Sequence, residues 1–206
     1  MPLVRKPAAS STPRSPSPKE VFAGLGSADP AERWAAARAA AELPDLASAL
    51  ARALPKEAEP RVREAMLTGL VRIGTRESLL SLLPMLRADD AALRMGAVDA
   101  LRSSVAIVRE VLPRLLQDPS ADLRIVSCEL ARALTSDEAS RALCALLIDE
   151  SDVNVCAAAI EVLAEVGTPA ALPALAQCAR RFAQAPFLSF AIRLATDRIT
   201  AAGDRG

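Results

Sequence analysis

Small and apolar residues recur along this chain with the spacing of an α-helix, and the same arrangement returns at an almost constant interval. The clearest copy is the segment 62–74, with the sequence VREAMLTGLVRIG. The copies share an anchor position, and these anchors, which lie 30, 31, 30 and 32 residues apart, are Arg33, Arg63, Arg94, Arg124 and Cys156. A repeat of this length is typical of helical solenoids, in which each repeat packs on its neighbours around one continuous core.

Each repeat predicts a pair of amphipathic helices. The first helix follows an acidic turn, such as Glu59-Pro60, in which a carboxylate can cap the helix N-terminus. Small or apolar residues, such as Gly69 and Leu70, then follow the anchor at helical spacing, and the small ones would let neighbouring helices approach closely. A turn with Pro or Gly leads to a second helix with a Leu-rich end. Because no segment alternates with period two, we expect no sheet.

The beginning of the chain differs from the repeats. Residues 1–16 are rich in Pro, Ser, Ala and basic residues and lack periodicity, so we expect a disordered basic tail. The predicted solenoid covers residues 17–202. It begins with Ser17 as a helix cap, Pro18 at the first helical position and Glu20 as the partner in a capping box.

The repeated phrase has a recognisable form. It reads acid-Pro-x-x-Val-Arg-x-x-Ala-x-x-x-Leu, followed by Gly-x-Pro-x-Ala-x-Pro-x-Leu as in the segment 155–175. This pattern resembles the HEAT-repeat family, in particular the compact bacterial type shared with phycobilin lyases, over residues 18 to 182. The resemblance implies an all-α fold, an α-α superhelix of about five helical-pair repeats plus terminal capping helices. It also implies that each anchor Arg bonds an acidic residue of the preceding turn, with a missing rung at Cys156.

The composition offers little for catalysis. The chain has no His, which removes the usual general base, the commonest metal ligand and every His-containing triad. Its four cysteines contain no Cys-x-x-Cys motif, and Cys128, Cys144 and Cys178 fall at apolar positions of the repeats. We therefore expect buried free thiols rather than a zinc site or disulfides. The sequence predicts a protein that is not an enzyme and that has no cofactor and no metal.

Charge and hydropathy narrow the choice of partner. The formal net charge is zero, which argues against nucleic-acid binding through phosphate neutralisation. No run approaches the roughly 18 apolar residues of a membrane span, and the N-terminus has no apolar segment like a secretory signal. We expect a cytoplasmic protein that binds neither nucleic acid nor membrane, and its oligomeric state stays open.

Three classes of function remain. We favour a non-catalytic scaffold or adaptor that binds another protein through its concave or C-terminal surface, by analogy within a bacterial signalling or assembly complex. The second class is an accessory subunit like the bilin-lyase proteins, and the missing His and Tyr argue against it. The third is a protein like the HEAT-like DNA glycosylases, which need a basic face, and the net neutrality argues against it.

Two surfaces are candidates for the protein partner. In HEAT arrays the second helices line the concave face, and aligning them on their Leu-rich ends places a row of arginines there: Arg52, Arg87, Arg114, Arg141 and Arg180. Guanidinium groups pair with carboxylates bidentately, so this row predicts an acidic helix or loop as the partner. The alternative is that these are only the solvated positions of amphipathic helices. The second candidate is the last helix, residues 186–202, where Phe187 and Phe190 would form an apolar patch unless they are buried in a capping helix.

Overall fold

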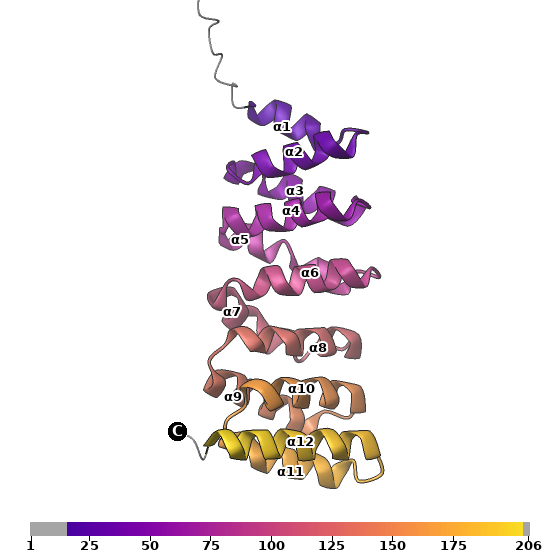
Figure 1. The fold of residues 1–206 in the computed structure, drawn as a ribbon, viewed down its shortest axis with the longest axis vertical. Coiled ribbons are helices and arrows are strands. Elements are labelled where there is room, and N and C mark those ends of the chain that lie inside the picture. The colour runs from indigo at the N-terminus through magenta and orange to yellow at the C-terminus, as the bar shows by residue number, and fades with distance from the viewer. Residues whose placement is uncertain (1–15, 204–206) are drawn as a thin grey trace, which may run out of the picture.

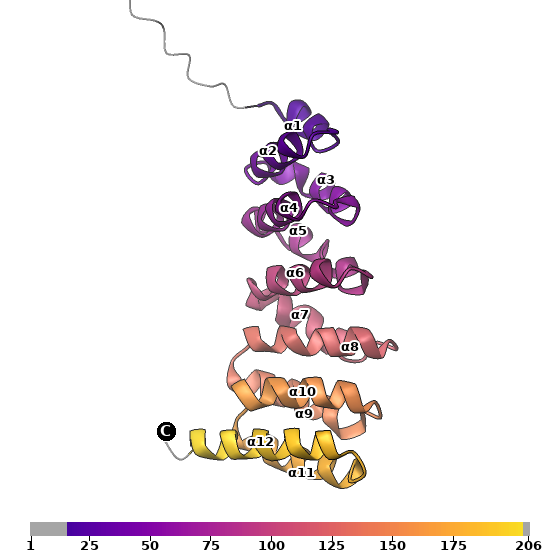
Figure 2. The same cartoon turned by 45° about the vertical axis from the view of Figure 1, so that its right-hand side comes forward.

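The computed structural model describes residues 16–203, and in that range the chain forms helices and turns with no strand. Twelve α-helices and five short 3-10 helices are stacked into one column (Figures 1 and 2). The predicted all-α solenoid is confirmed. The predicted disordered tail falls almost entirely on residues 1–15, which lie outside the described residues.

The helices form two layers, which we call the A layer and the B layer. The A layer holds the first helix of each repeat and lies across the front of Figure 1. It consists of α2 (Pro30–Ala40), α4 (Pro60–Ile73), α6 (Ala91–Arg102), α8 (Ala121–Cys128) continued by η4 (Glu129–Ala133), α10 (Val153–Val166) and α12 (Pro186–Gly203). Consecutive A helices pack on one another, as α2 does on α4 and α10 on α12.

The B layer holds the second helix of each repeat. It consists of α1 (Pro18–Gly24), α3 (Ala47–Ala53) between η1 (Pro44–Leu46) and η2 (Leu54–Lys56), α5 (Arg76–Leu80) followed by η3 (Leu83–Arg87), α7 (Val105–Leu115), α9 (Ser136–Asp149), and α11 (Leu172–Arg181) preceded by η5 (Pro169–Ala171). The first described helix, α1, is therefore of the B type, and the last, α12, is of the A type.

Side-chain caps fix where the helices begin. Ser17 and Glu20 form the predicted capping box, in which the backbone N–H of Ser17 donates to the Glu20 carboxylate at 2.6 Å. At α6 the Asp90 carboxylate accepts hydrogen bonds from the backbone N–H groups of Ala92 and Leu93, at 2.8 and 3.1 Å. These caps satisfy N–H groups that have no partner within the helix, whereas the Glu59 side chain makes no such bond at the start of α4.

Small residues allow the A helices to lie close together. A Cβ atom on Gly96 would come within 2.6 Å of Leu67 Cδ1 in the preceding repeat. On Gly69 it would lie 3.4 Å from the carbonyl oxygen of Ala37, also in the preceding repeat. Gly96 and Gly69 lie two and six positions after their anchors, whereas Ala37 and Leu67 both lie four positions after theirs. The A layer therefore has a fixed register, in which the position four after an anchor faces the next repeat.

Several second helices are shorter than the sequence suggested. In the second repeat α5 ends at Leu80, and the chain continues as the 3-10 helix η3, which contains Pro84. A proline lacks the N–H group and excludes the carbonyl four residues earlier, so it interrupts an α-helix. The core is continuous in spite of these breaks, because Leu50, Leu70 and Leu101 are fully buried in successive repeats. None of the described helices is long and apolar enough to cross a membrane.

Candidate functional site

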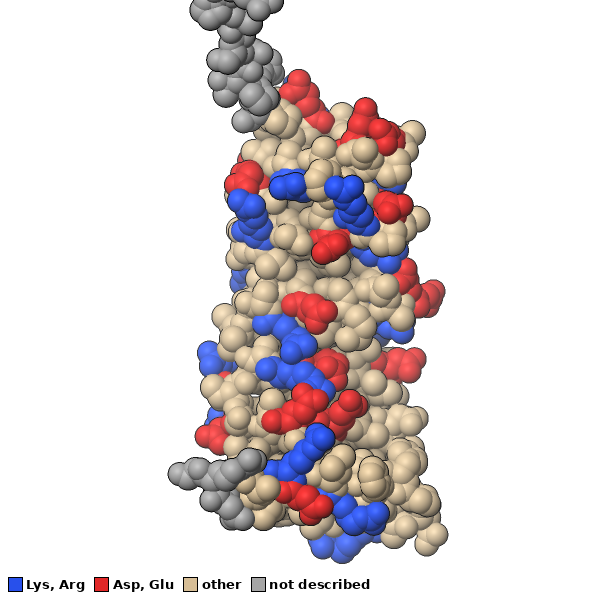
Figure 3. All heavy atoms as spheres, viewed as in Figure 1, with Lys and Arg blue, Asp and Glu red and all other residues tan. Residues whose placement is uncertain are grey.

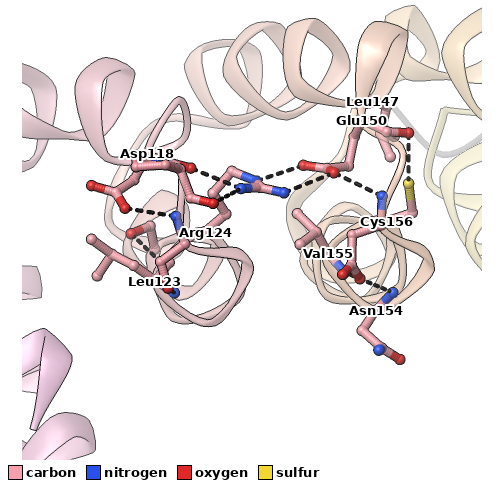
Figure 4. Close-up of polar contacts among 12 residues, drawn as sticks. Asp118, Leu123, Arg124, Leu147, Glu150, Asn154, Val155 and Cys156 are labelled. Atoms are coloured by element: carbon pink, nitrogen blue, oxygen red, sulfur yellow. Dashed lines mark hydrogen bonds and ion pairs between the residues drawn. The ribbon is translucent and has the colours of Figure 1, made fainter.

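The anchor arginines connect the repeats and are not free to bind a partner. In the fourth repeat, Arg124 Nη1 donates to the backbone carbonyls of Asp118 and Pro119, at 2.7 and 3.2 Å, in the turn that precedes its own helix. The same guanidinium donates from Nε and Nη2 to the carboxylate of Glu150, at 2.7 and 3.0 Å (Figure 4). Glu150 belongs to the next turn, so one side chain joins two consecutive turns.

The direction of this ladder differs from what the resemblance implied. Arg33 donates to the carbonyl of Ser27 in the preceding turn at 3.0 Å and to the carboxylate of Glu57 in the following turn at 2.7 and 2.9 Å. The preceding turn therefore supplies backbone carbonyls, and the carboxylate comes from the turn after. The acid of the preceding turn, Asp29, serves as the helix cap and accepts the backbone N–H of Ala31 at 2.9 Å.

The two carboxylates of the complete rungs are buried. Glu57 is 6% exposed and Glu150 is 7% exposed. The hydrogen bond from Arg33 holds the pKa of Glu57 below its ordinary value. Burial alone would raise the pKa of Glu150, but the hydrogen bonds from Arg124 and from the backbone N–H of Asp152 outweigh it, so this pKa is also lowered. A buried charge of this kind is tolerated because it is paired and hydrogen-bonded.

The middle rungs are incomplete, for a reason visible in the sequence. Ala88 occupies the position equivalent to Glu57, so Arg63 pairs instead with the helix cap Asp90 at 2.8 Å. In the next repeat Arg94 donates to the carbonyls of Ala88 and Asp89 at 2.6 and 2.9 Å, and no carboxylate within residues 16–203 pairs with it. The ladder is strongest at its two outer rungs.

In the fifth repeat a different residue replaces the missing arginine. Arg181, on α11, donates to the carbonyl of Leu147 at 2.6 Å and to that of Ile148, and its Nη2 lies 3.9 Å from Cys156 Sγ. The Cys156 thiol is fully buried and donates to the carbonyl of Glu150 at 3.8 Å. The contact between turns at Cys156 is therefore kept by a B-layer side chain.

Four of the five arginines predicted to bind a partner are free. Arg52, Arg114, Arg141 and Arg180 are exposed on α3, α7, α9 and α11, and no ion pair or hydrogen bond joins their side chains to any other residue of 16–203. Each lies two positions after a buried residue of its helix, for example Arg52 after Leu50 and Arg114 after Leu112. Two residues turn a helix by about 200°, so these side chains point away from the core.

The fifth arginine of the prediction does not belong to this group. Arg87 pairs with Asp118 at 2.5 Å, near the turn that follows α7. Phe187 and Phe190 are also separate, because they lie on α12 in the A layer. The structure therefore divides the predicted site residues between the outer surface of the B layer, which we call the arginine surface (Arg52, Arg114, Arg141 and Arg180), and the end of the column.

Two exposed apolar side chains accompany the arginine surface and were missed at the sequence level. Phe22 is 55% exposed and lines a groove that also includes Arg52 and Lys56. Ile148 is 49% exposed and lines a groove with Arg141. The sequence contained a signal for Ile148, since it directly follows the buried Leu147, and adjacent helical positions do not face the same side.

The apolar face of α12 is divided in two. Leu188, Ile192 and Ile199 are buried against the preceding helices, as a capping helix requires. Phe187 and Phe190 are instead 53% and 61% exposed. The sequence placed Phe187, Phe190, Ile192, Leu194 and Ile199 on one apolar face, which is wrong, because Ile192 and Ile199 lie on the buried side of the helix and the other three on the exposed side. Leu194, which is 40% exposed, completes the outer stripe.

The cysteines form no metal site. Cys128, Cys156 and Cys178 are fully buried as free thiols, and Cys144, predicted to lie in the core, is only half-buried. The hydrogen bond with Cys156 and the charge of Arg181 lower the pKa of Cys178. Within residues 16–203 no group of three or more Cys, Asp or Glu side chains is placed to hold a metal ion.

Comparison with known proteins gives a clear result for the fold. The family model described as HEAT repeats matches residues 18–102 and 108–184. No curated protein matches. Among solved structures, a designed armadillo repeat protein is 17% identical, with 87% of this chain and 98% of that chain covered and a TM-score of 0.39.

Two further solved structures are similarly distant. An engineered protein is 19% identical, with 90% of this chain and 97% of that chain covered and a TM-score of 0.40. The complex of CpcE and CpcF of phycocyanin lyase from Nostoc sp. PCC7120 is 16% identical, with 96% and 100% covered and a TM-score of 0.37. Likeness at this level supports no statement about what the chain binds.

Proposed function

Since this chain belongs to the HEAT-repeat family, whose stacked helices present long exposed surfaces, we propose that it is a non-catalytic scaffold that binds a partner protein. The binding site in this proposal is the arginine surface. The partner presents an acidic helix or loop to it.

One observation supports this choice of surface. From α2 to α10, every arginine of the A layer has a partner, either a carboxylate, a backbone carbonyl or the ring of Trp34. In the B layer, four arginines have none. A free guanidinium keeps all five N–H donors available for a ligand, and Arg is enriched at protein interfaces.

The grooves beside the arginines indicate what else the partner should carry. Ile148 lies in a groove with Arg141, Cys144 and Ala145, between α9 and the start of η5. An apolar side chain of the partner can enter this groove while a neighbouring carboxylate pairs with Arg141. The combination favours an amphipathic acidic segment over a purely acidic one, because the apolar contact contributes affinity that salt does not screen.

The same proposal places the protein in the cytoplasm and assigns it no catalytic role. The four cysteines are free thiols, which suits a reducing compartment. The chain lacks His, the usual general base.

The test compares two variants with the same change of charge. In R114E/R141E two arginines of the arginine surface are reversed, and in R193E/R198E two exposed arginines of α12 are reversed. All four side chains are exposed, so both variants should melt with the wild type. Tagged proteins are used to capture partners from the native host, and the captured protein is quantified by mass spectrometry. We expect R114E/R141E to lose most of it and R193E/R198E to keep it, whereas undiminished capture by R114E/R141E would contradict the proposal.

A further inference from the structure

Arg94 is the exception among the anchor arginines, because part of its guanidinium has no partner. Its Nη1 donates to the carbonyls of Ala88 and Asp89, at 2.6 and 2.9 Å. Its Nε and Nη2 make no hydrogen bond or ion pair with any residue of 16–203. No buried side-chain nitrogen in this part of the chain lacks a hydrogen-bond partner, so these two donors are open to solvent.

The two complete rungs hold the guanidinium in the same way. Arg33 Nη1 donates to two carbonyls of the preceding turn at 3.0 and 3.1 Å, and Arg124 Nη1 does so at 2.7 and 3.2 Å. In both rungs the edge formed by Nε and Nη2 then pairs with a carboxylate, that of Glu57 or Glu150 (Figure 4 shows the second). Because two carbonyls fix the orientation of a planar guanidinium, the free edge of Arg94 faces the equivalent place.

The residue that would fill this place is too short. Glu57 and Glu150 each lie two positions before the N-cap of the following A helix, and Asp118 has the equivalent position before α8. An aspartate is one methylene shorter than a glutamate, and the Asp118 carboxylate pairs instead with Arg87. The chain therefore builds the donor half of a rung at Arg94 without the acceptor half.

A groove beside Arg94 gives access to these donors. It lies between the start of α6 and the start of α8 and has a volume of about 450 Å³. Ile125 and Val126 of α8, both half-buried, line it together with Arg94. A carboxylate group alone would leave much of this groove empty, so the chain that carries the carboxylate can contact the two apolar side chains.

The charges around the groove restrict the ligand. Two exposed carboxylates, Asp89 and Asp122, also line it. They do not prevent pairing, because Asp29 and Glu59 act on Arg33 in the same way and that rung is complete. Figure 3 shows this mixture along the edge where the A helices begin, with acidic side chains protruding and basic ones between them. Such surroundings repel a doubly charged phosphate more than a singly charged carboxylate.

We propose that Arg94 binds the side chain of a glutamate from another protein, which completes the missing rung. Nε–H and Nη2–H donate to its two oxygens, as those of Arg33 donate to Glu57. The residues next to this glutamate pack on Ile125 and Val126. Two hydrogen bonds alone hold a small free acid only weakly, since they do not offset the freedom it loses on binding, so the carboxylate belongs to a protein segment with further contacts.

This site rests on the proposed function only in taking a protein as the ligand. The groove opens at the turns before α6 and α8, whereas the arginine surface lies on the outer side of the B helices. Substitutions at Arg94 and Asp118 leave all four residues of the arginine surface unchanged. Either proposal can therefore fail while the other holds.

The first measurement uses small probes on the full chain. The side-chain Nε–H signals of the arginines are followed by NMR during titration with a capped tripeptide that has glutamate between two leucines. We expect it to bind at Arg94 about tenfold more tightly than at the solvated Arg114. The same tripeptide with glutamine in place of glutamate should shift neither signal. Equal responses at Arg94 and Arg114 would overturn the proposal, as would tighter binding of propionate or of inorganic phosphate at Arg94.

Substitutions at Asp118 provide the decisive comparison. D118E places a glutamate where the complete rungs have one, so Arg94 should gain a partner within the chain, the melting temperature should rise and the tripeptide should no longer bind. D118N removes the ion pair with Arg87 without supplying a longer carboxylate, so it should still bind the tripeptide. R94Q should lose binding with no rise in melting temperature. A D118E variant that still binds the tripeptide would contradict the proposal, and so would a D118N variant that loses it.

Discussion

The A layer and the B layer use the same residue type in opposite ways. In the A layer, Arg33 and Arg124 are held between two turns by four hydrogen bonds each. In the B layer, Arg114 and Arg141 extend into solvent with no partner in the described part of the chain. The difference lies in where each arginine sits on its helix. The anchor lies near the N-terminal turn, whereas the free arginines lie on the side of the helix opposite the core.

This contrast shows that a count of arginines says little about a binding surface. An arginine whose donors are satisfied within the fold contributes to stability and offers nothing to a ligand. One whose donors are free costs the fold little and remains available. The division also predicts that substitutions in the two layers will have separate effects, on unfolding in one layer and on binding in the other.

The sharpest test of the contrast replaces one arginine in each layer. Arg124→Ala should lower the free energy of unfolding by about 3 kcal/mol, because it leaves the buried Glu150 carboxylate without its partner. Arg114→Ala should change it by less than about 0.5 kcal/mol, as is usual for exposed positions. Urea unfolding measures both values. Equal midpoints for the two variants would show that the ladder does not stabilise the array.

The next test concerns the close approach of the A helices. Gly69→Leu should cost roughly 1–3 kcal/mol, because the new side chain meets Leu50 and the backbone of α2. Ala145→Leu adds similar bulk on the exposed side of α9 and should change the melting temperature very little. If Gly69→Leu melts with the wild type, the A helices are not packed as closely as the structure shows.

The smallest effect expected is on the pH dependence of stability. Glu57 and Glu150 have lowered pKa values in the folded protein, so each stabilises the fold at a pH above its ordinary pKa of about 4.5. This contribution is lost as the pH falls through the lowered values, because the folded carboxylates are then protonated as well. The unfolding midpoint should therefore decrease in mild acid for the wild type. The decrease in midpoint should be smaller for E57Q/E150Q. An equal decrease in the variant and the wild type would contradict the lowered pKa values of Glu57 and Glu150.

The repeat pattern was sufficient to predict the fold. Five copies spaced 30 to 32 residues apart fix the helical phase more firmly than any single segment does, and the caps at Ser17 and Asp90 follow from local chemistry alone. The direction of the ladder was not predictable in this way. A spacing pattern does not show whether Arg124 reaches a carboxylate 6 residues before it or 26 residues after it.

The surface residues were predicted only in part, because sequence spacing shows which side of a helix a residue is on but not what a distant repeat brings next to it. A position two residues after a core Leu is exposed in any helix, so Arg52 and Arg114 could be placed from sequence. The partner of Arg87 could not, because Asp118 is 31 residues away and meets it only through the stacking of repeats. On α12 the buried and exposed apolar stripes lie on opposite sides of the helix, since Phe190 and Ile192 are two positions apart. Helical spacing separates these two residues, but it does not tell which of them the array covers.

At Cys156, Arg181 takes the place of an anchor arginine. This substitution affects which segments of the array can be exchanged as a unit. In the fourth repeat, the groups that join two turns come from one helix and the turn after it. In the fifth they come from α11, so a graft of α10 alone into another position would carry Cys156 without the guanidinium that accompanies it. A cut in the turn between α9 and α10 would separate Arg181 from the carbonyls of Leu147 and Ile148. The interchangeable module of this protein is therefore set by where its hydrogen bonds cross, and it changes length along the chain.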